Sequence, residues 1–227
     1  MTSTPDPPAA DPRSSRLVSA LEALLAACVV LGHNVWKALP NEVPILFLLG
    51  LVSYRLRDGS FASIGFRRPT SWGPIVAIAA GAAALRIGLG EWVVEPLAAR
   101  AWPPIVAPSG ANEIAGNPGT ALLWLLLVWT FAAFGEEIAY RGYLLGRSAE
   151  ALGRSPLAYA VGAFLSSLLF GFGHFYKGPA GIVDSGVAGL VLAGAYLLAR
   201  RNLWAPVLAH GFIDTVAVAG LYAGWTS

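Results

Sequence analysis

The chain has 227 residues, of which 56% are hydrophobic and only 12% are charged, and its mean hydropathy is +0.62. An average soluble protein carries about 25% charged residues, so this composition excludes a soluble globular domain, and its hydrophobicity excludes an intrinsically disordered chain. The net charge of +2 argues against a nucleic-acid-binding protein, and the single cysteine, Cys28, excludes a disulfide framework. The composition predicts a polytopic membrane protein.

The N-terminal segment differs from the rest of the chain. Residues 1–15 are rich in Pro, Ser, Thr and Asp, and we expect them to form a disordered tail ahead of a single transmembrane domain, residues 16–227. A secretory signal peptide is not expected, because no basic segment opens the chain and the first apolar run begins late.

Seven stretches approach the length of about 20 apolar residues that a transmembrane helix needs. They are residues 16–36, 43–55, 73–93, 118–146, 156–174, 181–199 and 203–224, of which the second is short. Membrane β-barrel strands are shorter and alternate in polarity, which these stretches do not. The predicted fold is all-α, a polytopic membrane bundle of about seven transmembrane helices with the functional site in its interior.

Basic residues predict the orientation in the membrane. If the seven helices alternate in direction, four groups fall on one side: Arg13 with Arg16; Arg55, Arg57, Arg67 and Arg68; Arg147 with Arg154; and Arg200 with Arg201. Lys and Arg collect on the cytoplasmic side of membrane proteins. We therefore expect a multi-pass protein of the plasma (inner) membrane with a cytoplasmic N-terminus.

Ionisable residues inside the predicted spans are the main functional signal, because each costs about 2.5–3.5 kcal/mol at the centre of a membrane helix. The stretch 118–146 contains Glu136, Glu137 and Arg141. On an α-helix Glu137 and Arg141 are four residues apart in the favourable order for an ion pair, whereas Glu136 points about 100° away. Glu137 is therefore expected to have a structural role, and Glu136 to be available for chemistry. Arg86, in the span before, is expected to snorkel or to pair with an acid such as Glu91.

Two further spans each contribute a histidine. The stretch 156–174 ends with His174, beside which Gly171 and Gly173 leave room for another backbone or for a substrate. In the stretch 203–224, His210 and Asp214 are four residues apart and share a helix face. Acid and base groups from three helices in a low-dielectric interior can polarise a water molecule and stabilise an oxyanion.

Three motifs resemble those of a known family. EEIAYR (136–141) fits EExxxR, FGFGH (170–174) fits FxxxH, and HGFID (210–214) fits HxxxN or HxxxD. In order, spacing and membrane context they resemble the CPBP family, named for CAAX proteases and bacteriocin-processing enzymes. The segment SIGFRRPTSW (63–72) is similar to a Gly-basic-Pro stretch of bacterial members. The resemblance covers about residues 45–217, with a protease-like core at about 118–217.

The resemblance implies an intramembrane endopeptidase, similar to a CAAX prenyl protease, that hydrolyses a peptide bond near the cytoplasmic membrane face. Carried over, Glu136 is the general base that activates water and His174 assists it. His210 and Asp214 stabilise the oxyanion, and Glu137 with Arg141 supports the site. The implied partners are a peptide or protein substrate, lipidated or not, and membrane lipids, with no nucleic acid.

One departure from the family bears on cofactors. Prenyl proteases of eukaryotes have Asn where this chain has Asp214, and an ionised Asp cannot donate a hydrogen bond to an oxyanion. Asp214 must therefore be protonated, orient His210 or bind a metal. Zinc held by His174, His210 and either Glu136 or Asp214 is the alternative to metal-independent chemistry. The chain has no HExxH motif, so we favour the metal-independent mechanism and commit to no cofactor.

Two other functions remain open. The chain could be a non-catalytic immunity or scaffold protein that binds a partner through the same cavity. A proton-coupled transporter is disfavoured, because transporters usually contain internal repeats and the motifs are not repeated.

Depth along the helices also conflicts with a shared site. Counting at 1.5 Å per residue places His210 about 10 Å and Glu136 about 15 Å from the inner ends of their spans, but His174 about 27 Å from Pro156. The three meet only if the helix ending at His174 is strongly tilted or begins along the inner interface.

Overall fold

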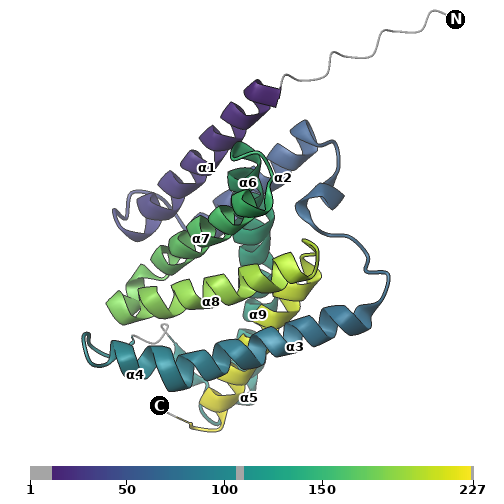
Figure 1. Ribbon diagram of the computed structural model, residues 1–227. Helices are drawn as coiled ribbons and strands as arrows, with labels where there is room; N and C mark the ends of the chain where they lie inside the picture. Colours follow the sequence, from purple (N-terminus) through teal and green to yellow (C-terminus); the bar gives the residue numbers. More distant parts are fainter. Residues whose placement is uncertain (1–11, 106–109, 226–227) are drawn as a thin grey trace, which may run out of the picture.

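The computed structural model describes residues 12–105 and 110–225, and the elements in these two ranges are helices (Figure 1). The α-helices are α1 (Pro12–Asn34), α2 (Glu42–Arg57), α3 (Trp72–Leu89), α4 (Glu95–Ala98), α5 (Pro118–Leu127), α6 (Gly146–Ala151), α7 (Pro156–Gly173), α8 (Gly178–Leu198) and α9 (Trp204–Tyr222). Short 3₁₀ turns are η1 (Phe61–Ile64), η3 (Ala111–Glu113) and η5 (Phe175–Lys177), and π-helices are η2 (Gly90–Val94) and η4 (Val128–Leu145). The predicted all-α fold is confirmed.

Of the predicted N-terminal tail, residues 1–15, the first eleven residues lie outside the described residues. Residues 12–15 are helical, because α1 begins at Pro12, inside the predicted tail.

Among the described residues, six helical segments are long and apolar enough to cross a membrane, and the chain is an integral membrane protein. They are Ser15–Asn34, Trp72–Ala98, Pro118–Ala151, Pro156–Gly173, Phe175–Leu198 and Trp204–Tyr222. The predicted stretch 43–55 forms α2, which at 16 residues is shorter than the usual span. The structure thus has six long spans and one short helix where about seven spans were expected.

The segment with the two glutamates is longer and differently wound than expected. The prediction was a helix over 118–146, but α5, η4 and α6 continue one another as far as Ala151. Residues 128–145 are π-helical, with backbone hydrogen bonds to the fifth residue along the chain. π-Helical backbone is rare and is frequently found at functional sites, and here it contains the whole EEIAYR motif.

Small residues bring the central helices together. α7 and α8 lie side by side, between α1 on one side and α3 on the other (Figure 1). A Cβ atom added at Gly171 of α7 would lie 2.6 Å from the carbonyl oxygen of Ile182 and 3.3 Å from the backbone of Gly186, both in α8. The space predicted beside His174 at Gly171 is therefore filled by another backbone, as expected for helix packing in a membrane.

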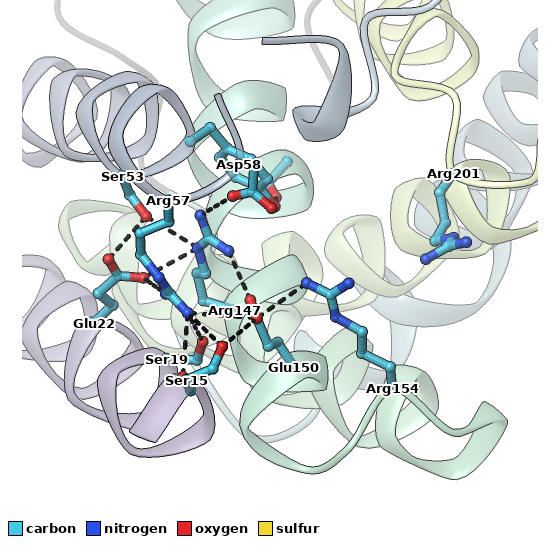
Figure 2. A network of polar contacts seen from close by, with 12 residues as sticks. Ser15, Ser19, Glu22, Ser53, Arg57, Asp58, Arg147, Glu150, Arg154 and Arg201 are labelled. Carbon is cyan, nitrogen blue, oxygen red and sulfur yellow. Dashed lines mark hydrogen bonds and ion pairs between the residues drawn. The ribbon is translucent and has the colours of Figure 1, made fainter. Parts of the chain in front are cut away.

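The basic groups gather at one end of the bundle. Arg67 donates hydrogen bonds to the carbonyl oxygens of Arg200 at 2.9 Å and Arg201 at 3.4 Å. In the close-up of the same end, Arg57, Arg147 and Arg154 converge on Glu150 (Figure 2). This grouping agrees with the common side predicted for the arginines.

Arg86 has a different partner from the one suggested by its sequence. It forms a 2.5 Å ion pair with Asp184 of α8 instead of pairing with the nearby Glu91. Both side chains are largely buried, at 13% and 8% exposure. The pair between α3 and α8 neutralises two buried charges inside the membrane region. A pair of Arg86 with the exposed Glu91 would leave Asp184 unpaired.

Candidate active site

Glu137 lies at the centre of the polar groups inside the bundle. Its side chain is fully buried, and its Oε1 accepts hydrogen bonds from Arg141 Nη1 at 2.7 Å and from His210 Nδ1 at 2.8 Å. The expected pair of Glu137 with Arg141 is present. The bond to His210 was not predicted, because the two residues are 73 positions apart and no local pattern connects them.

Arg141 is held from three directions. Besides Glu137, it donates from Nη2 to the carbonyl oxygen of Gly189 in α8 at 3.1 Å, and its guanidinium lies 4.4 Å above the ring of Phe170. The carboxylate, the carbonyl oxygen and the aromatic face each offset part of the free-energy cost of burying the guanidinium charge. Arg141 therefore connects η4, α7 and α8.

Phe170, the first residue of the second motif, brings the two histidines together. Its ring centroid lies 4.8 Å from that of His174 and 6.1 Å from that of His210, and it packs edge-on against Tyr140 at 5.1 Å. The aromatic residue of FxxxH thus acts as a spacer between the second and third motifs.

His174 ends α7, and its ring orientation is fixed by its own helix. Nδ1 lies 2.9 Å from the carbonyl oxygen of Phe170. Because a carbonyl oxygen only accepts, this bond assigns the proton to Nδ1 and leaves Nε2 with a free lone pair in the neutral ring.

His210 is flanked by two carboxylates. Its Nδ1 contacts Glu137, and its Nε2 lies 3.5 Å from Oδ2 of Asp214, one helical turn along α9. The position of α9 against η4 depends on Gly211, since an added Cβ would overlap the ring of Trp129 at 2.5 Å. Trp129 in turn donates from Nε1 to Thr215 at 3.1 Å.

Glu136 differs from its neighbour in having no fixed partner. Its Oε2 is buried and accepts no hydrogen bond from the residues that the structure describes. His210, Asp214 and Glu137 are among the ionisable groups close enough to interact electrostatically with its carboxylate. The two adjacent carboxylates thus differ in their ion pairing, since Oε1 of Glu137 is bound by Arg141 and His210, although Oε2 of each glutamate is buried without a partner.

An apolar groove reaches Glu136 from the lipid-facing side. A cavity of about 400 Å³ is lined by Glu136 and by residues at the start of α2 and along α5 and η4, and an adjoining cavity of about 300 Å³ shares Val43, Pro44 and Phe131 with it. Phe131 is 62% exposed on the outer surface of the bundle. The free carboxylate thus lies at the inner end of a lateral groove.

Sequence reasoning missed Glu42. It is 4% exposed, its carboxylate accepts from the Tyr140 hydroxyl at 3.5 Å, and it lies 3.6 Å from Nε2 of His33. A Cβ at Gly173 would lie 3.2 Å from Glu42 and 2.7 Å from the Tyr140 hydroxyl, so protein side chains fill the space predicted beside Gly173. The available signal was an acidic residue directly before an apolar stretch, which resembles an ordinary first helical turn.

The expected conflict in depth does not arise. Gly162 of α7 packs against the backbone of Leu145 and Ala149, and eight residues further on Phe170 packs against Tyr140. The two helices therefore run alongside each other in opposite directions, and the end of α7 reaches the level of Glu137. The conflict came from ending the glutamate helix at residue 146, whereas it continues to Ala151.

The geometry gives no support to the zinc alternative. Within the described ranges, no group of three or more His, Cys, Asp or Glu side chains is arranged to hold a metal ion. Nδ1 of His174 and Nδ1 of His210 are both engaged by protein oxygens, which leaves one nitrogen on each ring. We therefore derive no step through a metal.

The fold and these contacts define an integral membrane protein of α-helices that has acidic and basic side chains in contact inside the bundle. A family model described as "Type II CAAX prenyl endopeptidase Rce1-like" matches residues 118–216. The match supports the family resemblance seen in the motifs and includes the six predicted site residues. No curated protein and no solved structure matches the chain.

Proposed function

We propose that the protein is an intramembrane endopeptidase in which the carboxylate of Glu136 activates a water molecule. The observation that carries the proposal is the contrast between the two adjacent glutamates. Oε1 of Glu137 is bound by Arg141 and His210, although its Oε2 has no partner, while the carboxylate of Glu136 is held by no such ion pair and lines a groove. A free carboxylate in a low-dielectric site is suited to general-base catalysis.

In this mechanism Glu136 takes a proton from water, and the resulting hydroxide attacks the scissile carbonyl carbon. His174 orients the water through its free Nε2. The C–N bond then breaks, and Glu136 returns its proton to the leaving amine. These roles are supported by the side-chain arrangement and by the motifs in the matched segment.

His210 is the proposed donor to the oxyanion. With protons on both ring nitrogens, it donates one to Glu137 and presents the other toward the substrate. Preorganised donors of this kind stabilise the charge that develops on the carbonyl oxygen. Asp214, whose Oδ2 lies 3.5 Å from Nε2, is proposed to orient the ring by electrostatic attraction, without a hydrogen bond that would occupy the Nε2 proton.

The substrate is proposed to be a lipidated peptide or protein that enters from the bilayer. The lateral groove is lined mainly by apolar side chains, and it leads from the exposed Phe131 to Glu136. An acyl or prenyl chain in this groove would gain about 0.8 kcal/mol per buried CH₂ group. The arginine-rich end of the bundle is proposed to lie on the cytoplasmic side of the inner membrane, and the N-terminus on the same side.

Purified protein in lipid nanodiscs is expected to cleave lipidated peptides faster than the same peptides without lipid. Chelators are expected to leave the rate unchanged, because the proposed mechanism uses no metal. Cleavage is measured by mass spectrometry of the products. Loss of activity with a chelator, restored by zinc, would contradict the metal-independent mechanism, and absence of cleavage of any peptide by folded protein would count against the peptidase.

Filling the groove tests the lipid-binding role separately. Thr130 lines the second cavity, and Thr130→Trp is expected to raise KM for a lipidated peptide about tenfold, the loss of about two CH₂ contacts, with kcat unchanged. The unlipidated peptide should be cleaved as by the wild type. Leu122→Trp is the matched control, since Leu122 is 67% exposed on the same helix and lines neither cavity. Equal KM values for Thr130→Trp and the control would contradict binding of the lipid chain in the groove.

A further inference from the structure

A second cavity, separate from the candidate active site, lies at the arginine-rich end of the bundle. It has a volume of about 350 Å³, within the range of small-ligand sites. Three guanidinium groups and three phenolic side chains line it: Arg67, Arg154, Arg201, Tyr54, Tyr159 and Tyr196. These residues come from α2, α7, α8 and three connecting loops, and none of them belongs to the three motifs.

The charges around this cavity do not cancel. Its one lining carboxylate, Asp58, is bound to Arg147 at 2.7 Å. Arg154 pairs with Glu150 at 3.0 Å, and Glu150 is shared with two other arginines (Figure 2). The carboxylates near the cavity are thus already engaged by other guanidinium groups.

Two of the lining arginines have no acidic partner. Among the described residues, no carboxylate lies within 4.0 Å of the guanidinium of Arg67 or Arg201. Arg67 donates to backbone carbonyls, and Arg201 donates to the Tyr159 hydroxyl and stacks on its ring at 4.8 Å. In Figure 2, Arg201 stands apart from the ion-pair network. The cavity therefore carries an excess of positive charge.

The backbone at this cavity is also unusual. Arg154 and Arg201 have φ angles of 57° and 62°, in the left-handed region that favours glycine. Residues kept in this region against their preference cluster at binding and catalytic sites. At both positions the unfavourable backbone accompanies a guanidinium that lines the cavity.

We propose that this cavity binds a phosphate group, supplied either by the headgroup of an anionic phospholipid or by a soluble phosphate compound. Guanidinium groups bind phosphate oxygens through paired, charge-assisted hydrogen bonds, and the tyrosine hydroxyls offer further donors. The site lies at the end of the bundle where basic residues collect, which is the level of lipid phosphates in a bilayer. It is a binding site distinct from the peptidase proposal and does not depend on it.

The test uses the full-length protein in two arms. In the first, protein in neutral phosphatidylcholine nanodiscs is titrated with inorganic phosphate, and thermal unfolding is compared with sodium chloride at equal ionic strength. In the second, nanodiscs contain some phosphatidylglycerol and no phosphate salt, and lipids retained by the released protein are identified by native mass spectrometry. Phosphate stabilisation assigns the site to a soluble ligand, and selective retention of phosphatidylglycerol assigns it to a lipid.

The variant Arg67→Gln/Arg201→Gln is expected to weaken the observed binding at least tenfold, as loss of charge-assisted hydrogen bonds does. Arg55→Gln is the matched control, because Arg55 is exposed at the same end and does not line the cavity. If the double variant does not fold, Arg67→Gln alone serves, since Arg67 contacts only carbonyl oxygens. Binding equal to that of the wild type in both arms, or no binding by the wild type in either, would overturn the proposal.

Discussion

Replacement of Arg141 by methionine is expected to destabilise the protein by about 3–5 kcal/mol, because it leaves the fully buried carboxylate of Glu137 without its ion-pair partner. It also removes the contact to Gly189 and the guanidinium above Phe170. The free energy of unfolding is measured by denaturant titration in detergent micelles.

The double variant Glu137→Gln/Arg141→Met separates the charge effect from the loss of packing. It is expected to recover much of the lost stability, because the buried carboxylate that Arg141 neutralised is removed together with Arg141. Arg55→Met, at an exposed position, is the control and should change stability by less than about 0.5 kcal/mol. A loss no larger in Arg141→Met than in this control would mean that the pair is not a structural element.

Replacement of His210 by phenylalanine is expected to lower kcat for peptide cleavage by about 10²–10³, the usual cost of losing one oxyanion donor. Phenylalanine keeps a ring against Phe170 but removes the hydrogen bond to Glu137 and the 3.5 Å contact with Asp214. KM should change little, because the donor acts mainly in the transition state. Initial rates over a range of peptide concentrations give both constants.

His33→Phe is the control for this substitution. His33 is the third histidine of the chain, bonded to the carbonyl oxygen of Leu39, and it has no place in the proposed mechanism. Its variant should keep the wild-type kcat. A kcat for His210→Phe within a few-fold of that of the control would contradict the role of His210 as donor to the oxyanion.

The sequence predicted the features that depend on short spacing. The presence of the long apolar helices, the arginine groups near their ends and the i, i+4 pair of Glu137 with Arg141 follow from local sequence, and each has a direct physical cause. The three motifs likewise indicated the resemblance that the family model matches at residues 118–216.

The remaining features depend on contacts between distant segments. The bond between Glu137 and His210, the pairing of Arg86 with Asp184, and the approach of Glu42 to Tyr140 connect helices whose mutual packing has no signature in a single sequence. The π-helical winding was missed for another reason, since apolar periodicity was interpreted with α-helical angles throughout.

The role of Glu136 as general base is tested most directly by comparing wild type with Glu136→Gln for both cleavage and binding of one lipidated peptide. Glu113→Gln, at the exposed end of η3, is the matched control. We expect Glu136→Gln to lower the cleavage rate by about 10²–10⁴ while peptide affinity and thermal stability stay close to the wild-type values. Cleavage by Glu136→Gln at the wild-type rate would contradict the role of Glu136, and tight binding without cleavage by the wild type would favour a non-catalytic binding protein.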